Sequence, residues 1–137
     1  MQSVLIAGSG GQGILFLGKL LAQSVMTEGR NVTWFPSYGA EVRGGTANCM
    51  VIISDEMIGS PILKNPDILV VLNEASKERF ESRLRQDGLM LLDSSLIKKP
   101  VARKDVHVIN VPATEIAASL GSAKSANMVM LGALISG

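Results

Sequence analysis

The sequence has one cysteine, one histidine and few aromatic residues among its 137 residues. With only Cys49, the chain cannot form an internal disulfide, and it cannot by itself supply the thiolates of an iron–sulfur cluster or a thiolate-rich zinc site. The single histidine, His107, falls in a β-like segment, and we find no paired carboxylates, metal-spaced His/Glu set or Ser/His/Asp arrangement. The residues therefore indicate no catalytic group or metal site within this chain.

The sequence also lacks an excess of charge and a long hydrophobic run. Its 13 Lys and Arg residues against 12 Asp and Glu residues give a net charge of +1, so no strong field favours nucleic acid or an anionic membrane. The apolar segment 126–135 is far shorter than the ~20 residues of a membrane span. The first residues, "MQSVLIAG", do not look like a signal peptide. We therefore expect a cytoplasmic protein with no nucleic-acid or membrane partner.

The length and the apolar fraction of 47% suit one domain, expected over residues 1–137. Hydrophobic runs predict strands at 4–7, 31–35, 47–54, 67–73, 88–93 and 106–111, and helices at 12–29, 76–85, 112–120 and 126–136. A hairpin or bent strand is expected in "DEMIGSP", residues 55–61. The alternation predicts a three-layer α/β/α Rossmann-like sandwich with a mostly parallel sheet, opening on a βαβ unit.

Two of the predicted helices carry specific expectations. Ser76 is expected to cap the 76–85 helix, with Lys77 among the residues on its outer face. The 126–136 helix is apolar on nearly all sides, which is typical of a helix buried all round. Either the domain's own core buries it, or further chain or a partner covers it.

The first glycine-rich segment, "GSGGQG", lies between the first predicted strand and the first predicted helix. Gly8, Gly10 and Gly13 match the G-x-G-x-x-G pattern, in which backbone N–H groups and a helix N-terminus can face an anion. A tight strand-to-helix turn can need the same glycines for steric reasons alone. The second predicted strand runs into Pro36 without the acidic residue that binds the ribose of NAD. This argues against NAD and leaves another phosphate-bearing ligand or a partner chain.

The second glycine-rich segment, "YGAEVRGGTANC", should leave the sheet at the same edge as the first, where open α/β sheets bind ligands. Arg43 offers a planar fork of donors for phosphate or carboxylate, and Glu41 could hold that fork or bind a partner's cation. A structural loop whose ion pair only fixes its shape is the alternative. The candidate ligand-binding residues of both segments are Gly8, Gly10, Gly11, Gln12, Gly13, Tyr38, Glu41, Arg43, Gly44, Gly45, Thr46 and Asn48.

Neighbouring residues have simpler interpretations. Trp34 and Tyr38 could offer a flat surface to a ring of a ligand. Cys49 is expected to enter the next strand as a small buried hydrophobic residue. The basic residues between 98 and 104 are most simply a solvated loop, although an acidic partner or a ligand phosphate could meet them.

Together, "GSGGQG", "YGAEVRGGTANC", "PDILVVLN" and "NMVMLGA" closely resemble the gamma subunit of 2-oxoacid:ferredoxin oxidoreductases, from Val4 to about Ala133. The 2-oxoglutarate type is most similar, with pyruvate and ketoisovalerate types as relatives. The resemblance implies a complex that converts a 2-oxoacid and coenzyme A to acyl-CoA, carbon dioxide and reduced ferredoxin. This chain, inactive alone, would help to bind coenzyme A. Chains of this family usually continue further, so a shortened C-terminal segment is expected.

The resemblance also implies what the chain works with. Thiamine diphosphate, magnesium and [4Fe–4S] clusters are expected on partner subunits only. Those partners are the thiamine-binding alpha and beta subunits, with a ferredoxin-like delta subunit as a further candidate and ferredoxin itself reached through the complex. Two other hypotheses stay open. One is a stand-alone nucleotide-binding reductase, which rests on the first glycine-rich segment, and the other is a structural adaptor whose glycine-rich segments clamp neighbouring subunits.

Overall fold

The computed structural model describes residues 2–9, 13–37, 46–54, 65–121 and 126–136. Its strands are β1 (Gln2–Ser9), β2 (Asn31–Ser37), β3 (Thr46–Ser54), β4 (Ile68–Val71), β5 (Leu89–Asp93) and β6 (His107–Val111). Its helices are α1 (Ile14–Met26), α2 (Glu74–Phe80) with the 3-10 turn η3 (Glu81–Arg83), α3 (Ala113–Ser119) and α4 (Ala126–Ser136). The expected hairpin at 55–61 lies outside the described residues.

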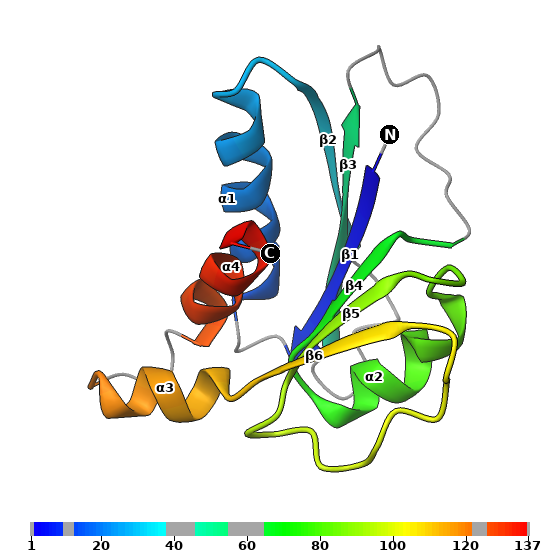
Figure 1. The fold of residues 1–137 in the computed structure, drawn as a ribbon. Helices are drawn as coiled ribbons and strands as arrows, with labels where there is room; N and C mark the ends of the chain where they lie inside the picture. The colour runs from blue at the N-terminus through cyan, green and yellow to red at the C-terminus, as the bar shows by residue number, and fades with distance from the viewer. Residues whose placement is uncertain (1, 10–12, 38–45, 55–64, 122–125, 137) are drawn as a thin grey trace.

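The six strands form one sheet in the order β2-β3-β1-β4-β5-β6 (Figure 1). β1, β4, β5 and β6 run parallel to one another, and β3 is antiparallel to both of its neighbours. The predicted mostly parallel sheet is confirmed. The opening βαβ unit differs in one respect, because β3 lies between β1 and β2. β1 and β2 run in the same direction but do not pair, because β3 lies between them and is antiparallel to both.

Helices cover both faces of the sheet, as the three-layer prediction requires. Val4 and Ile6 of β1 belong to a core cluster with residues of α1, α3 and α4, whereas Leu5 and Ala7 belong to a second cluster with Phe80 of α2. This division follows from the alternation of side chains along a strand. Figure 1 shows α1 and α4 on one side of the sheet and α2 on the other.

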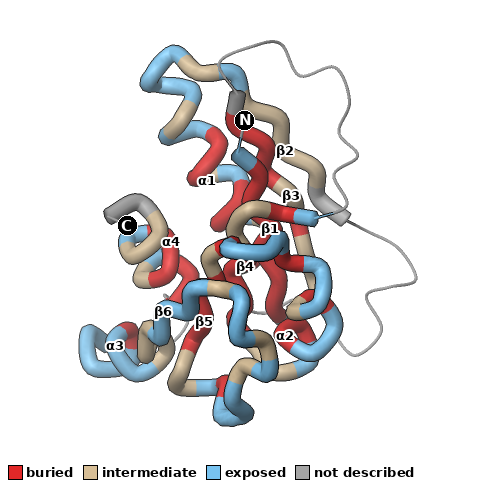
Figure 2. The backbone as a smooth tube through the Cα atoms, turned by 45° about the vertical axis from the view of Figure 1, so that its right-hand side comes forward, coloured by how far each residue is buried: buried red, intermediate tan, exposed pale blue. Residues whose placement is uncertain are grey.

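Burial is concentrated in the middle of the sheet. β1, β4 and β5 are largely buried, whereas β6 and α3 are mostly exposed (Figure 2). In the apolar helix α4 the side chains of Met130 and Leu131 are buried, whereas Met128 is 46% exposed. Its neighbours in the described structure therefore cover one side of α4. No helix in the described parts of the chain is long and apolar enough to cross a membrane.

Helix α1 follows its sequence pattern. Ile14, Leu17 and Leu21 fall on one face at helical spacing, and all three are buried against the sheet. The helix ends at Met26, and Gly29 takes the left-handed conformation expected of a terminator, with φ at +82°.

Gly18 lets α1 approach the sheet closely. A Cβ at this position would lie 2.4 Å from Sγ of Cys49 and 2.9 Å from Nε1 of Trp34. The indole of Trp34 therefore packs beneath α1, and Nε1 is buried. Helix α1 thus covers the Nε1 edge of the indole, whereas Trp34 as a whole is half-buried, and contact between its ring and a ligand stays a prediction.

Helix α2 begins two residues earlier than predicted. Asn73 caps it, with Oδ1 accepting from the Ser76 N–H at 3.0 Å, because Asn73 is extended while Ser76 is already helical. The outward placement expected for Lys77 is also wrong. Lys77 is 3% exposed, and its Nζ donates to the Pro100 carbonyl at 3.1 Å and lies 3.6 Å from Oε1 of Glu81. The segment after β5 covers this face of α2, a long-range contact that helical periodicity cannot show.

Candidate functional site

The strand ends that flank the two glycine-rich segments lie at one edge of the sheet. Ser9, the last residue of β1, lies opposite Thr46, the first residue of β3. On the other side of β3, Asn48 lies opposite Ser37 at the end of β2. This is the edge at which the parallel strands have their carboxyl ends. The described residues that flank both segments therefore lie at one edge of the sheet, as expected, and ligand binding at this edge stays a prediction.

Four of the predicted ligand-binding residues can be placed. Gly8 is buried in β1 and pairs with Ala47, and Gly13 is the N-cap of α1. Thr46 opens β3, and Asn48 is half-buried two residues further along. Gly10, Gly11, Gln12, Tyr38, Glu41, Arg43, Gly44 and Gly45 lie outside the described residues. Ligand contact by any of the twelve stays a prediction.

Gly13 is held by its conformation and by a residue far along the chain. It takes the left-handed conformation, with φ at +67° and ψ at +37°. Its carbonyl accepts from the Leu17 N–H at 3.0 Å and from Nδ2 of Asn127 in α4 at 3.4 Å. A Cβ at position 13 would lie 2.6 Å from that Nδ2 atom. The left-handed conformation favours glycine here, and any larger residue would have to displace the Asn127 amide, whatever the ligand.

Asn127 was missed as a site residue by sequence reasoning. It stands in the "NMVMLGA" segment that contributed to the family resemblance, yet nothing in its local pattern points to the glycine-rich segment more than a hundred residues earlier. Its burial, with 7% of the residue exposed, could not be predicted in an otherwise apolar helix. Only the packing of α4 beside α1 shows the connection.

The start of α4 lies beside the start of α1 because Asn127 reaches Gly13. Helix α1 has 13 residues and α4 has 11, and neither has an acidic residue in its first turn. Free N–H groups and the positive ends of helix dipoles favour a negative group at such a place. The edge therefore carries a local preference for anions in a chain of nearly zero net charge.

A buried carboxylate shapes the neighbouring part of the same edge. Asp93, the last residue of β5, is fully buried. Its Oδ1 accepts from the Ser95 N–H at 3.1 Å, and its Oδ2 accepts from the Thr114 hydroxyl at 2.6 Å. Sequence reasoning missed this link, although an acid at the end of a strand before serines was a usable signal. Asp93 joins the β5 turn to the start of α3, and these contacts favour a structural role.

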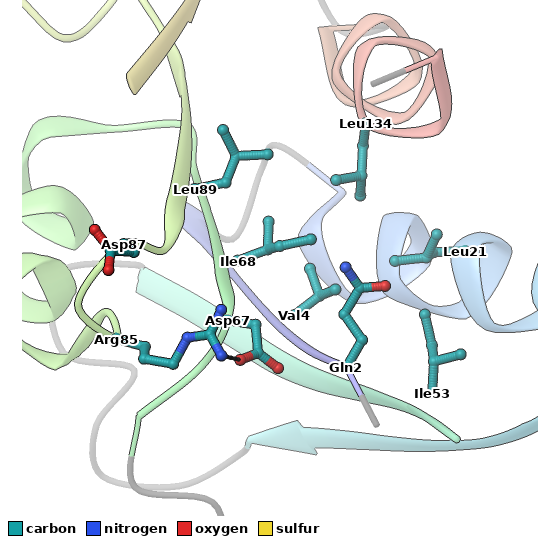
Figure 3. Close-up of a pocket in the computed structure, with 10 residues that line it drawn as sticks. All are labelled: Gln2, Val4, Leu21, Ile53, Asp67, Ile68, Arg85, Asp87, Leu89 and Leu134. Atoms are coloured by element: carbon teal, nitrogen blue, oxygen red, sulfur yellow. Dashed lines mark ion pairs between the residues drawn. The ribbon is translucent and has the colours of Figure 1, made fainter. Parts of the chain in front are cut away.

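A hollow of about 400 Å³ lies at the opposite edge, where β1, β4 and β5 begin (Figure 3). Apolar side chains, among them Val4 and Leu134, line one part of it. The charged part holds an ion pair, with Nη1 of Arg85 3.1 Å from Oδ1 of Asp67. The second carboxylate oxygen accepts from the backbone N–H of Ser3 at 2.9 Å. We do not assign this hollow to ligand binding, because open α/β sheets bind ligands at the carboxyl edge.

Cys49 behaves as the buried hydrophobic residue that the sequence predicted. It is fully buried, and its Sγ donates to the Ile14 carbonyl at 3.6 Å. Burial raises the pKa of the Cys49 thiol from 9.0 to about 11, although the Trp34 side chain partly opposes this shift. A thiol with this pKa is a poor nucleophile near neutral pH. Within the described ranges there is also no group of three or more His, Cys, Asp or Glu residues able to hold a metal ion.

Comparison with known proteins identifies the family. The model of the pyruvate ferredoxin/flavodoxin oxidoreductase family matches residues 3–136. The chain is 46% identical over 132 residues to the ketoisovalerate oxidoreductase subunit VorA of Methanothermobacter thermautotrophicus, covering 96% of this chain and 27% of VorA. It is 34% identical over 136 residues to the 2-oxoglutarate synthase subunit KorC of Methanocaldococcus jannaschii, covering 97% of this chain and 73% of KorC.

Solved structures share the fold. The keto/oxoacid ferredoxin oxidoreductase gamma subunit of Geobacter sulfurreducens has a TM-score of 0.86 and 28% identity, covering 98% of this chain and 76% of that one. The 2-oxoglutarate:ferredoxin oxidoreductase of Magnetococcus marinus, solved with 2-oxoglutarate, coenzyme A and succinyl-CoA bound, has a TM-score of 0.88 and 27% identity. That match covers 97% of this chain and 23% of the Magnetococcus chain. The chain belongs to the pyruvate ferredoxin/flavodoxin oxidoreductase family and is similar to its gamma subunits.

Proposed function

We propose that this chain is the gamma part of a multi-subunit 2-oxoacid:ferredoxin oxidoreductase and that its glycine-rich edge helps to bind coenzyme A. The complex would convert a 2-oxoacid, coenzyme A and oxidised ferredoxin to acyl-CoA, carbon dioxide and reduced ferredoxin. Thiamine diphosphate, magnesium and [4Fe–4S] clusters would be held by the alpha and beta subunits and by a ferredoxin-like delta subunit where one is present. The chain alone would be inactive.

The observation that carries this proposal is the sheet register that brings Ser9 and Thr46 side by side. It places the ends of two glycine-rich segments at the carboxyl edge, where backbone can approach a ligand closely. The starts of α1 and α4 add a preference for anions at the same place, and coenzyme A carries phosphate groups. The Magnetococcus relative, whose solved structure contains coenzyme A, supports this choice of ligand.

The preferred 2-oxoacid has two candidates. The motifs of the sequence resemble the 2-oxoglutarate type, whereas the identity of 46% to the ketoisovalerate subunit exceeds the 34% to the 2-oxoglutarate subunit KorC. Assays of the assembled complex with 2-oxoglutarate, 2-ketoisovalerate and pyruvate as alternative substrates decide between them. The substrate with the highest kcat/KM identifies the type.

Arg43 provides the test of coenzyme A binding. A charge-assisted hydrogen bond to a phosphate should contribute about 1.5–3 kcal/mol, so Arg43→Ala should weaken coenzyme A binding by about 10- to 150-fold. Isothermal titration calorimetry on the assembled complex measures this change. Lys104→Ala is the matched control, because Lys104 is an exposed cation in the segment before β6, on the side of the amino-terminal edge. Equal affinities for both variants and the unmodified complex would remove Arg43 from coenzyme A binding.

Two further measurements separate the other hypotheses. A stand-alone reductase predicts that the isolated chain changes the fluorescence of NADH or NADPH, and we expect no change because the second strand lacks the ribose-binding acid. A purely structural adaptor predicts co-purification with thiamine-type and ferredoxin-type subunits without any effect of either glycine-rich segment on coenzyme A affinity. We expect co-purification together with such an effect.

A further inference from the structure

We infer that Asn127 is a positioning residue for the glycine-rich edge: its side-chain amide holds Gly13, and through Gly13 the end of the segment "GSGGQG". The inference deepens the proposed function and rests on it, since it assigns α4 a part in coenzyme A binding. Asn127 lies outside the glycine-rich segments and is separated from Gly13 by 114 positions along the chain. The tertiary contact alone brings the two residues together.

Both ends of the Asn127 amide are engaged. Oδ1 accepts from the Met128 N–H at 2.9 Å, and Nδ2 donates to the Gly13 carbonyl at 3.4 Å. The two contacts fix the orientation of the amide, because a flipped amide would set its NH2 group against a backbone N–H and its oxygen against a carbonyl. Asn127 is 7% exposed, so a lost contact would not simply be replaced by bulk water.

Gly13 receives this contact in a position that allows little movement. Its carbonyl already accepts the first hydrogen bond of α1, from the Leu17 N–H at 3.0 Å. Its left-handed conformation favours glycine, and a Cβ would lie 2.6 Å from Nδ2 of Asn127, so a larger residue would displace the amide. The first turn of α4 and the start of α1 therefore form one packed unit at the edge of the sheet.

Asn127 should act through Gly13 and not by binding the ligand itself. Its oxygen is used within its own helix, and the residue is almost completely buried. Met130 and Leu131 of the same helix are packed in the core cluster, which anchors α4 and keeps the amide in place. Loss of the amide should therefore shift the backbone that meets coenzyme A without removing a group from the reaction.

Two variants isolate the contact. Asn127→Asp keeps the shape and the acceptor for the Met128 N–H but loses the donor to Gly13, and an acidic residue in the first turn of a helix favours folding. Asn127→Ala loses both. Met128→Ala is the matched control, because its side chain is 46% exposed on the neighbouring position of the same helix.

The assembled complex is assayed with coenzyme A as the varied substrate. Asn127→Asp and Asn127→Ala should each raise the KM for coenzyme A by about five- to tenfold while kcat changes by less than about twofold, since ground-state and transition-state binding are lost equally. Met128→Ala should leave both parameters unchanged. Asn127→Ala introduces no charge, so a raised KM in that variant as well separates the lost contact from repulsion of an anionic ligand by the new carboxylate of Asn127→Asp.

Hydrogen exchange supplies a readout that does not depend on activity. The Leu17 amide, which donates to Gly13, should exchange faster in both Asn127 variants than in the Met128→Ala control. An unchanged KM overturns the inference, whether or not exchange becomes faster. If Arg43→Ala weakens coenzyme A binding and the Asn127 variants do not, only the role of Asn127 fails. If the unmodified complex does not bind coenzyme A in the calorimeter, the proposed function fails as well.

Discussion

Ser9 lies directly opposite Thr46 in the antiparallel pairing of β1 with β3. One residue closes the strand before the first glycine-rich segment, and the other opens the strand after the second. The pairing is the reason that the strand ends beside the two segments, which residues 14–37 separate in the sequence, lie at one edge of the sheet. It also provides a direct test of the register.

A disulfide can test this register. Directly opposed residues of an antiparallel pair have Cα atoms about 4.5–5.5 Å apart, which a disulfide can span. The Ser9→Cys, Thr46→Cys variant should therefore form an internal disulfide on oxidation, detected by mass spectrometry of non-reduced peptides. Cys49 is buried and should not compete.

The control for the disulfide is the Ser9→Cys, Asn48→Cys variant. Asn48 pairs with Ala7, two positions from Ser9, so its side chain lies on the same face of the sheet but further away. It should form a disulfide more slowly and in lower yield. Equal yields for the two variants would contradict the register.

Gly18 provides a prediction about stability. Alanine favours helix over glycine by about 0.8–1.0 kcal/mol, but the new methyl group would meet Sγ of Cys49 at 2.4 Å and Nε1 of Trp34 at 2.9 Å. Gly18→Ala should therefore lower the free energy of unfolding by about 1–3 kcal/mol, as overpacked cores do. Chemical denaturation measures the change.

Gly132 is the matched control for Gly18. It also lies in a helix, and a Cβ there meets no described atom within 4 Å. Gly132→Ala should raise the free energy of unfolding by about 0.5–1 kcal/mol. Adding Cys49→Ala to Gly18→Ala should recover part of the loss, because it removes the nearer of the two clashing atoms. Equal effects of the two glycine substitutions would show that the close approach of α1 at Gly18 is wrong.

Cys49 provides a prediction about pH. Burial raises the pKa of its thiol from 9.0 to about 11 in the folded chain, so the unfolded chain ionises first as pH rises. The stabilisation by the neutral thiol is complete below pH 9 and is lost as pH rises toward 11. Between pH 8 and pH 10 the free energy of unfolding should fall by about 1 kcal/mol from this residue.

Comparison with Cys49→Ala isolates the thiol, since every other titrating group is shared. The difference in unfolding free energy between the unmodified chain and Cys49→Ala should shrink by about 1 kcal/mol between pH 8 and pH 10. In addition, iodoacetamide at pH 8 should modify Cys49 only after denaturation. Rapid modification of the folded chain would contradict its burial.

Asp93 and Thr114 should be energetically coupled. Asp93→Ala leaves the Thr114 hydroxyl and the Ser95 N–H without their acceptor, and should lower the free energy of unfolding by about 2–4 kcal/mol. Thr114→Val should cost about 1–2 kcal/mol. The double variant should cost less than the sum by about 1–2 kcal/mol, as contacting residues in one network do.

The exposed pair of Glu78 and Lys99 is the control for this double-mutant cycle of Asp93 and Thr114. Its two charged groups lie 2.7 Å apart, which lowers the pKa of the Glu78 carboxyl and raises that of Lys99. Both groups are in contact with water, so Glu78→Ala should leave the unfolding free energy unchanged. An additive cycle for Asp93 and Thr114 would show that their contact does not stabilise the chain.

Local sequence patterns predicted most of the secondary structure. The apolar stripe of α1 and the buried runs of β4 and β5 are found close to where periodicity placed them, and Gly121 follows α3 with φ at +102° as a helix terminator. β2 extends through Pro36 to Ser37, beyond the predicted end. Proline is tolerated there because β2 is an edge strand, with β3 as its only partner in the described sheet.

The candidate site could be predicted only in part. The position of the glycine-rich segments after β1 and β2 follows from the order of the elements, and their common edge follows from the parallel direction of these strands. The antiparallel insertion of β3, which brings Thr46 beside Ser9, could not be predicted, because the order of strands in a sequence does not specify their order in a sheet. The burial of Lys77 beneath the Pro100 segment was missed because helical periodicity does not show which distant segment packs on a helix.

The sequence by itself determined the family, the α/β alternation and the presence of two glycine-rich segments, because these depend on residues close together in the chain. Only the tertiary structure showed why glycine is favoured at position 13 and which residue contacts it. The left-handed turn at Gly13 and the approach of Asn127 come from elements at opposite ends of the chain. Such contacts depend on how the helices pack on the sheet, and local sequence patterns do not predict that packing.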